Sequence, residues 1–442
     1  MILSSRLLRP IIRSTKRTCS PNPSAILRTL LRQPPQLRYI GFKMAMEEPP
    51  SLAADSPIGS GKEVDTPNGD VDVSGQNSMQ TWEPRFVDIG INLTDPVYIG
   101  LYHGKQQHQN DLAAVVQRAR DVGCEKLIVT GSDLKHSKDA VRLAGEFPNT
   151  IYATIGVHPC NAQSLTPETL SQLTTFAQTS TKAGQAVAFG EIGLDYDRLE
   201  LCPKDIQLRA FEQQLSLAVE LQLPLFLHSR AAHADFLRLL SEHEKDLPKR
   251  GVVHSFTGTM EEMRELVERG WHIGVNGCSL KTQENCDVVK EIPLHKLHLE
   301  TDGPWCEIRP THASSAILAK MREDLGFAPK PKGKPGNGKG AKVDAVEGED
   351  PGMGWGGGWK SVKKEKWVEG AVVKGRNESC FIGRVAWAVA GIKGLSVQEV
   401  ADAAWRNSVE MFGLGVGLDG EVQEEESKGK ALRNGVEGLK SE

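Results

Sequence analysis

The sequence predicts a (β/α)₈ barrel between about residues 84 and 412. Eight short runs rich in β-branched and aliphatic residues occur there, separated by amphipathic stretches, as is typical of parallel strands buried on both faces. Two further helical stretches follow the eighth run, and right-handed crossovers readily close such an arrangement. An open, doubly wound sheet is the alternative, but no Gly-rich phosphate fingerprint follows the first run, which disfavours a dinucleotide-binding fold.

The elements follow one another regularly along the chain. The expected strands are Phe86–Leu93, Lys126–Thr130, Ile151–Gly156, Ala186–Glu191, Pro224–His228, Gly251–Ser255, Trp271–Val275 and Leu297–Thr301. Among the helices between them, the segment that begins near Asp205 shows the clearest helical period. Its apolar face comprises Leu208, Phe211, Leu215 and Ala218. The two closing helices are expected at about Cys380–Ala390 and Val397–Phe412.

Four segments are expected to lie outside the barrel. Residues 1–46 carry nine Lys/Arg, and the first acidic residue is Glu47, which indicates a mitochondrial presequence. The alternatives are a disordered basic arm, or initiation at Met44 or Met46 to give a cytoplasmic or nuclear protein. We expect residues 47–83 to be a disordered linker and 413–442 a disordered tail. Residues 328–366 are interpreted as a low-complexity Lys/Gly/Pro insertion in a surface loop, whose lysines and tryptophans are candidate nucleic-acid contacts.

Composition limits the functions that this chain can have. Its 442 residues, 39% hydrophobic and 25% charged, can bury a large core. The net charge of −4 argues against a generally basic nucleic-acid binder but permits local recognition at bound metal ions. The eight cysteines include no CxxC pair, which indicates free thiols and disfavours a thiolate zinc site. No apolar run is long enough to span a bilayer, so no membrane partner is expected.

Acidic and imidazole side chains stand at the ends of several expected strands, where a barrel of this kind builds its active site. They are Asn92, His158, Glu191, His228, His254 and Asp302. A single histidine at such a place is more often structural, but three of them with two carboxylates favour a metal centre. Imidazole and carboxylate together suit divalent transition metals, and carboxylate with water suits Mg²⁺ or Mn²⁺. The shortage of thiols favours a catalytic site over a structural zinc site.

The chain resembles the TatD family of metal-dependent deoxyribonucleases, within the metallo-dependent hydrolase superfamily, and most closely its eukaryotic branch. Eight motifs occur in the same order: DIGINLTDP (88–96), GVHPC (156–160), GEIGLDYD (190–197), PLFLHSR (224–230), GVVHSFTGT (251–259), GCSLKT (277–282), ETDGPW (300–305) and RNES (376–379). The resemblance runs from about Pro84 to Phe412, apart from the insertion. It implies a TIM barrel that hydrolyses phosphodiester bonds with one or two divalent ions.

The resemblance also implies roles for individual residues. Glu191 would bridge two ions, and His228 and His254 would bind one of them. Asp302 would bind the other ion. Its place beside the shared water makes it a candidate either for general base or for orienting that water. His158 would contact that water or the scissile phosphate, so the expected catalytic residues are Glu191, Asp302 and His158.

The first strand departs from a pattern that many relatives share. They carry an HxH motif there, whereas this chain has Gly90 and Asn92, as the TatD branch itself does. One ion would therefore rest on Glu191, Asp302 and water, with Asn92 as a candidate metal or water contact. We expect this ion to bind more weakly than the other, or only together with substrate.

Three further residues are candidates for contacting nucleic acid. Arg230 is expected to hold a phosphate, with an ion pair inside its loop as the alternative. Lys281 is a candidate backbone contact or a solvated lysine, and Trp305 a candidate base-stacking or packing residue. Asp88 and Asp195 are expected to orient ligand histidines.

The expected function is hydrolysis of DNA phosphodiester bonds by metal-activated water, in the 3'–5' exonuclease mode. The expected cofactors are Mg²⁺ or Mn²⁺, with Zn²⁺ as an alternative, and the expected partner is DNA, or RNA, without an obligate protein partner. The residues alone do not distinguish exonuclease from endonuclease action. Two other functions stay open: a metal-dependent amidohydrolase acting on a small amide, and a non-catalytic nucleic-acid-binding module.

Overall fold

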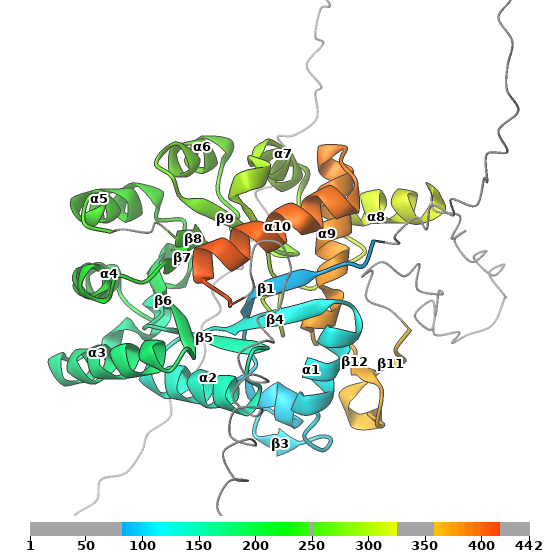
Figure 1. Cartoon of the computed structure of the whole chain (residues 1–442), viewed down its shortest axis with the longest axis horizontal. Coiled ribbons are helices and arrows are strands. Elements are labelled where there is room, and N and C mark those ends of the chain that lie inside the picture. Colours follow the sequence, from blue (N-terminus) through cyan, green and yellow to red (C-terminus); the bar gives the residue numbers. More distant parts are fainter. Residues whose placement is uncertain (1–81, 248–250, 325–357, 416–442) are drawn as a thin grey trace, which may run out of the picture. The chain divides into compact units, whose positions relative to one another are not determined.

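A computed structural model describes residues 82–247, 251–324 and 358–415 (Figure 1), which belong to one compact unit. The expectations for the presequence, nearly all of the linker, the tail beyond residue 415, and residues 328–357 of the insertion therefore lie outside the described residues.

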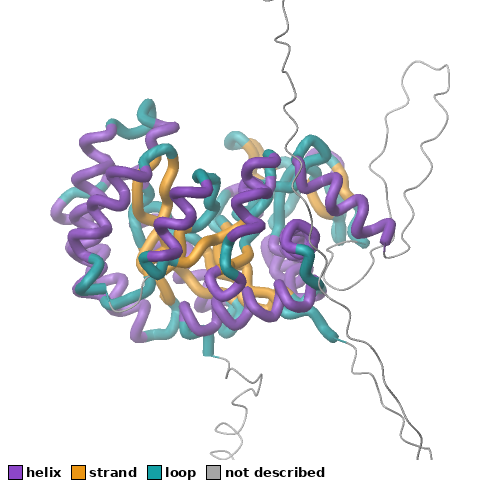
Figure 2. The backbone as a smooth tube through the Cα atoms, turned by 90° about the horizontal axis from the view of Figure 1, so that it is seen from above, coloured by secondary structure: helices purple, strands orange, loops and turns teal. Residues whose placement is uncertain are grey.

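Eight parallel strands form a nearly closed barrel with helices around it, which confirms the expected fold. The strands, in spatial order, are β1 (Phe86–Ile91), β4 (Cys124–Val129), β5 (Ile151–Ile155), β6 (Ala186–Asp195), β7 (Leu225–Arg230), β8 (Gly251–Val253), β9 (His272–Val275) and β10 (Leu297–Leu299). The helices are α1 (Leu112–Asp121), α2 (Leu134–Glu146), α3 (Pro167–Lys182), α4 (Lys204–Leu221), α5 (His233–His243), α6 (Met260–Glu268), α7 (Gln283–Glu291), α8 (Ala313–Asp324), α9 (Ile382–Lys393) and α10 (Val397–Phe412). Figure 2 shows the helices packed outside the strands.

The barrel closes where β1 meets the segment after β10. The Asp302 N–H donates to the Gly90 carbonyl and the Asn92 N–H donates to the Gly303 carbonyl, both at 2.8 Å. These two bonds join the beginning and the end of the sheet. They also bring the ETDGPW motif against the first strand, at the carboxyl ends of the strands.

The two largest apolar clusters of the described residues stabilise the barrel. The larger lies between strands and surrounding helices; within it Phe211, Leu215 and Ala218 of α4 are completely buried and Leu208 is partly buried, as their helical spacing predicts. The smaller joins inward-facing strand residues to the end of α10: Val87, Ile89, Ile128, Tyr152, Val187, Ala188, Phe226, Val252, Trp405, Val409, Phe412 and Leu414. Because most of these strand residues lie near the beginnings of their strands, α10 covers the amino-terminal end of the barrel (Figure 1) and leaves the opposite rim for a site.

Two expected strand ends are wrong. Glu191 lies inside β6, which runs on to Asp195, and His228 lies inside β7, which runs on to Arg230. A register irregularity between Gly190 and Ile192 lets β6 continue beyond the expected end. Both side chains are therefore carried by hydrogen-bonded strands, which hold them more rigidly than loops would.

The described part of the expected insertion, residues 358–366, is folded. Residues from Gly358 onward are described, and β11 (Ser361–Val362) pairs in parallel with β12 (Val372–Val373). Trp359 packs against the larger cluster, so the expectation of a structureless segment up to Lys366 is wrong for 358–366. A second small sheet, β2 (Leu101–Tyr102) with β3 (Lys105–Gln106), and helix α8 were also not expected.

No helix in the described ranges is by itself long and apolar enough to cross a membrane. Only α9, counted from Ser379, together with α10 meets that test of length and composition, and this pair is bent by 115°.

A histidine pair near the strand beginnings predicts loss of stability in acid. His272 Nδ1 lies 2.8 Å from His298 Nε2, and His298 Nδ1 lies 2.8 Å from the Ser408 hydroxyl. Burial lowers the pKa of His272 from 6.5 to about 4, with further lowering by Lys296 and His295, and burial holds the pKa of His298 well below its usual value. Between pH 6.5 and 4 the unfolded chain therefore takes up protons that the folded chain excludes.

We expect the free energy of unfolding to fall over that interval by on the order of 3 kcal/mol from His272 alone. Urea unfolding as a function of pH measures this loss. His272→Asn should flatten the pH dependence, whereas His103→Asn, at an exposed left-handed position (φ 48°), should not. Equal pH dependence of wild type and His272→Asn would contradict the assignment.

Candidate metal centre

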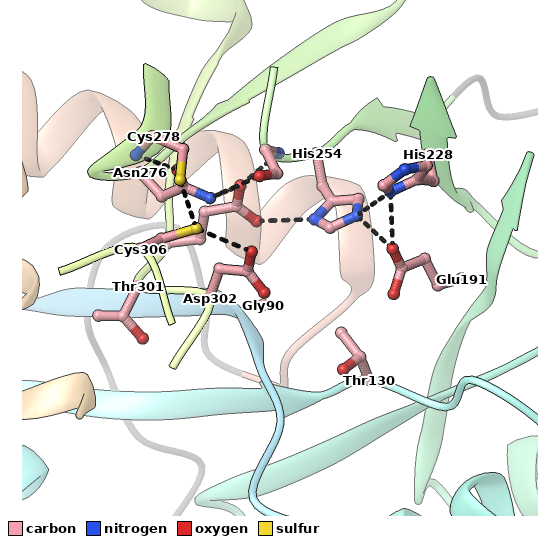
Figure 3. Close-up of polar contacts among 12 residues, drawn as sticks. Gly90, Thr130, Glu191, His228, His254, Asn276, Cys278, Thr301, Asp302 and Cys306 are labelled. Carbon is pink, nitrogen blue, oxygen red and sulfur yellow. Dashed lines mark hydrogen bonds and ion pairs between the residues drawn. The ribbon is translucent and has the colours of Figure 1, made fainter. Parts of the chain in front are cut away.

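Three imidazole nitrogens converge on one carboxylate oxygen at the rim of the barrel. Glu191 Oε1 lies 2.7 Å from His254 Nε2, 3.0 Å from His228 Nδ1 and 3.3 Å from His158 Nε2. The four side chains come from β6, β7 and the loops after β5 and β8. Figure 3 shows Glu191, His228 and His254 directed toward one another. Parallel strands place these residues together because their carboxyl ends share one edge of the sheet.

Gly190 permits this close packing of β6 against β7. Its φ is +156°, and a Cβ there would lie 2.1 Å from the Phe226 carbonyl oxygen. A side chain at this position would push β6 away from β7 and with it Glu191 away from His228.

The far nitrogens of two of these imidazoles face further carboxylates. His228 Nε2 lies 3.3 Å from Asp195 Oδ2, and His254 Nδ1 lies 3.5 Å from Glu300 Oε2. A carboxylate behind an imidazole keeps the proton on the far nitrogen and leaves the near nitrogen free to bind a metal. The two histidines thus present opposite atoms to the centre, Nδ1 from His228 and Nε2 from His254.

Glu300 is completely buried, and contacts on several sides hold its carboxylate in place. Oε1 accepts hydrogen bonds from the Ser255 backbone N–H and from Asn276 Nδ2, the latter at 3.2 Å. Oε2 lies where a side chain at position 90 would begin, since a Cβ on Gly90 would come within 2.7 Å of it. The glycine on β1 therefore leaves room for the carboxylate that supports His254.

The charges of the centre suit a cation. Burial would raise the pKa of Glu191, but His254 and His158 hold it well below its usual range. Burial would lower the pKa of His254, but Glu191 and Glu300 raise it well above its usual value. His228 Nδ1 and His254 Nε2 lie only 3.4 Å apart, so two imidazole nitrogens crowd the same side of one carboxylate. A divalent ion would replace the protons that hold this cluster together.

Two overlapping groups in the described residues have ligand atoms within 4.8 Å of one another. One is Glu191, His228 and His254, and the other is His158, Asp195 and His228. A set of imidazole and carboxylate ligands fits divalent transition ions. In the second group His158 Nδ1 accepts the Cys160 N–H at 3.1 Å, so in neutral His158 the proton is on Nε2, which faces Glu191. Neutral His158 is thus a hydrogen-bond donor toward the centre and not a metal ligand.

Asp302 lies beside this cluster but outside both groups. Its carboxylate accepts a hydrogen bond from Asn92 Nδ2 at 3.0 Å. It also accepts one from the Cys306 thiol at 3.3 Å (Figure 3). Burial raises the pKa of Asp302 to about 6, with Glu300 and Glu191 adding to the rise and His254 opposing it. Asp302 can therefore hold a proton at mildly acidic pH in the metal-free chain.

Comparison with known proteins identifies the family. Residues 87–413 match the TatD related DNase family. The chain belongs to this family. A curated relative, "Deoxyribonuclease Tat-D" of Schizosaccharomyces pombe, is 44% identical over 334 residues, which cover 74% of this chain and 96% of the relative. The "3'-5' ssDNA/RNA exonuclease TatD" of a Pantoea species is 40% identical over 230 residues, covering 51% of this chain and 82% of the relative. The crystal structure of a TatD family hydrolase from Entamoeba histolytica is similar, with a TM-score of 0.61, 33% identity, and coverage of 74% of this chain and 98% of that chain.

In this TatD-family chain the three expected nucleic-acid contacts differ in their surroundings. Arg230 Nε donates to Asp197 Oδ2 at 3.0 Å, which is the ion pair considered as its alternative. Lys281 is exposed, and Trp305 is 55% exposed, so Trp305 is not a packing residue. Asn92 uses its amide to hold Asp302 and the Gly303 carbonyl, and its Oδ1 accepts from the Thr130 hydroxyl. Asn92 thereby positions a candidate ligand.

The expectation for Asp88 is wrong, whereas that for Asp195 agrees with its contact to His228. Asp88 is buried and accepts hydrogen bonds from Thr301 N–H and Oγ1 at 2.9 and 2.6 Å and from Ser379 Oγ at 2.7 Å, and none of its hydrogen bonds within the described residues involves a histidine. Burial raises its pKa to about 7 against the lowering effect of these donors. Asp88 joins β1 to the ETDGPW and RNES motifs and so supports the Asp302 loop.

Sequence reasoning missed Glu300. The pattern that could have predicted it lies in the eighth expected strand and the residue after it. There His298, Glu300 and Asp302 alternate with Leu297, Leu299 and Thr301. Residues two apart share a face of a strand, so this alternation places Glu300 on the same side as Asp302. A glutamate on the inner face of a buried strand needs a cationic or hydrogen-bonding partner, and here the partners are His254, Ser255 and Asn276.

Glu300→Gln is expected to weaken metal binding about 10- to 100-fold, the effect typical of losing a residue that orients a metal ligand. The glutamine NH₂ would donate to His254 Nδ1 and move the imidazole proton to Nε2, the nitrogen that faces Glu191. Calorimetric titration with Mn²⁺ measures the effect. Glu265→Gln, an exposed carboxylate beside His233, is the control and should bind metal as the wild type does.

Proposed function

We propose that this chain is a divalent-metal-dependent nuclease that hydrolyses DNA phosphodiester bonds as a 3'–5' exonuclease. The convergence of His228 Nδ1 and His254 Nε2 on Glu191 Oε1, with a carboxylate behind each imidazole, is the observation that carries the proposal. The family supports a phosphodiester substrate, since relatives in it are named deoxyribonuclease and 3'-5' exonuclease.

Each residue of the centre has a separate task. Glu191, His228 and His254 would hold one ion, and Asp302 with Glu191 a second; when bound, such ions activate water and neutralise charge on the phosphate. Asp302, which Asn92 holds in place, would accept the proton of the attacking water as general base. His158 donates from Nε2 toward the centre, where a phosphate oxygen develops charge.

The two ions should differ in affinity. His228, His254 and Glu191 supply three ligand atoms already gathered together, whereas Asp302 stands outside that group. We propose Mn²⁺ or Mg²⁺ as the resident ions, with Zn²⁺ as the alternative that two imidazoles also accommodate. Titration of the free protein should reveal one tight and one weak site. Two equally tight sites would contradict this assignment.

The proposal is tested with purified protein and end-labelled DNA. Single- and double-stranded substrates are incubated with Mn²⁺, Mg²⁺ or Zn²⁺ and with chelator, and products are resolved by length. We expect cleavage only with metal, and a product ladder shortened stepwise from the 3' end. Metal-independent cleavage or none would overturn the proposal, and hydrolysis of cyclic amides without cleavage of DNA would favour an amidohydrolase.

We also propose import of the full-length chain into mitochondria. The support is the N-terminal segment, in which nine Lys/Arg precede the first acidic residue, Glu47. A C-terminal tag should give a mitochondrial signal and a mature band shorter than the full chain. A cytoplasmic or nuclear signal from a full-length band would favour a basic arm that is not cleaved, and the same signal from a shorter band alone would favour initiation at Met44 or Met46.

A further inference from the structure

A cavity of about 450 Å³ lies against the turn that follows Asp302. Its walls come from the loop after β1 (Val97 and Tyr102), the turn after β10 (Pro304 and Trp305) and the segment 363–376. The volume lies within the roughly 300–1,000 Å³ typical of small-molecule sites. Among the residues that line it, only Trp305 has a role expected from the sequence, as a candidate base-stacking residue.

One wall of the cavity is directly attached to Asp302. The Trp305 N–H donates to the Asp302 carbonyl at 3.1 Å, and the Pro304 carbonyl accepts from the Asn377 N–H at 3.0 Å. The Gly303 carbonyl is held from the other side by the Asn92 N–H and Nδ2 at 2.8 and 3.1 Å. A strand of nucleic acid whose phosphate reached the metal centre would therefore place an adjoining nucleotide against this wall.

The lining combines ammonium groups with aromatic rings. Lys363 and Lys374 are exposed and Lys364 is half-buried, and only one carboxylate, Glu365, lines the cavity with them. Within the described ranges none of the three lysines makes an ion pair, and Lys364 Nζ lies 4.8 Å from the centroid of the Tyr102 ring. The guanidinium of Arg376 also borders the cavity, but Asp111 and Glu378 neutralise its charge.

The lysines stand on a fixed support. The pairing of β11 with β12 holds both ends of the segment, with Ser361 opposite Val372 and Val362 opposite Val373 (Figure 1). Between them the Trp367 ring stacks on His108 with centroids 5.1 Å apart, and Trp367 Nε1 donates to the Ala371 carbonyl at 3.0 Å. Charges held in fixed positions favour ligands of a matching shape, whereas charges on a structureless chain do not.

We propose that this cavity binds the unpaired nucleotide next to the scissile phosphate; the inference rests on the proposed nuclease function. The base stacks on Trp305, whose ring is more than half exposed, and Lys363, Lys364 and Lys374 hold the phosphate that follows. Stacking requires an unpaired base, so the cavity selects single-stranded ends. Because the chain as a whole carries a net negative charge, a polyanion such as nucleic acid needs a local basic site of this kind to bind.

The binding test uses a short fluorescent single-stranded oligonucleotide in chelator, where a metal-dependent nuclease leaves the probe intact. Trp305→Ala is expected to raise Kd about 5- to 150-fold, the effect of removing one base-stacking interaction, and Trp305→Phe should largely restore binding. Lys363→Gln/Lys364→Gln/Lys374→Gln should reduce the slope of log Kd against log salt by about 0.7 for each phosphate that the lysines no longer neutralise.

A matched triple variant controls for charge alone. Lys182→Gln/Lys245→Gln/Lys290→Gln removes three exposed lysines near the C-terminal ends of α3, α5 and α7, on the opposite side of the barrel from the site. It should leave the salt dependence unchanged. If this control lowers the slope as much as the cavity variant does, or if Trp305→Ala binds the probe as tightly as wild type, the proposal is overturned.

Hydrolysis of bis(p-nitrophenyl) phosphate with Mn²⁺ separates the cavity from the metal centre, because this small diester has no neighbouring nucleotide. Trp305→Ala should raise KM for the oligonucleotide by a much larger factor than it lowers the rate of hydrolysis of the small diester. An equal fall in both reactions would mean that Trp305 acts through Asp302, which overturns the proposal. If wild type cleaves neither substrate, the proposed function fails, and the binding measurement alone still supports or overturns the cavity.

Discussion

Replacing Glu191 by glutamine is expected to lower kcat/KM for DNA by roughly 10³-fold, the upper end of what loss of one charge-stabilising group costs. The glutamine preserves the shape of the side chain but removes the charge on which His254, His228 and His158 converge. The amide NH₂ also cannot bridge two cations. Steady-state kinetics with labelled single-stranded DNA, together with Mn²⁺ titration, measure the two losses.

Folding controls make this result interpretable. The Glu191 backbone N–H donates to the Gly131 carbonyl at 2.9 Å, a bond that the substitution keeps, so circular dichroism should match wild type. Glu212→Gln, an exposed glutamate on α4, should retain full activity. Normal activity of Glu191→Gln would show that the centre around this carboxylate is not the site of catalysis.

Replacing Arg376 by methionine is expected to destabilise the chain by about 3–5 kcal/mol, the usual cost of removing one partner from a buried ion pair. Arg376 Nη1 and Nη2 donate to the two carboxylate oxygens of Asp111 at 2.9 and 2.6 Å, and Nη2 also donates to Glu378 at 2.8 Å. Arg118 completes this network, in which every side chain is at most 4% exposed. Without Arg376, Arg118 would be the one arginine left in this network beside two buried carboxylates.

Equilibrium unfolding in urea measures the loss. Arg209→Met is the matched control, because Arg209 pairs with Asp205 on the surface of α4 with both side chains more than 60% exposed, where ion pairs contribute roughly 0–1 kcal/mol. Similar losses for the two variants would mean that the buried network does not hold the RNES segment in place. Since Asn377 Nδ2 donates to the Thr301 carbonyl at 2.8 Å, we also expect Arg376→Met to disturb the Asp302 loop.

Local sequence patterns were sufficient to predict the features of this protein that depend on residues close together in the sequence. The alternation of apolar runs and amphipathic stretches predicts the strands, and the spacing along α4 predicts its buried face, because periodicity acts within a few residues. The positions of Glu191, His228 and His254 at the ends of expected strands predict them as ligands. In the structure their ligand atoms lie within 4.8 Å of one another. The topology alone brings them together, since every strand of a parallel barrel ends at the same rim.

Only the tertiary structure decided which partner each polar group takes. Asp88 bonds to Ser379, 291 residues away in the chain, and not to a histidine, while Glu300 takes the space beside Gly90 and supports His254. No periodicity encodes such choices, because a buried polar group takes whichever donor or acceptor the packing brings within reach. The same holds for the cavity beside Trp305, whose walls come from three segments distant in sequence. The sequence by itself thus determined the barrel and its ligand types, whereas the support of those ligands and the neighbouring cavity depended on how the segments pack.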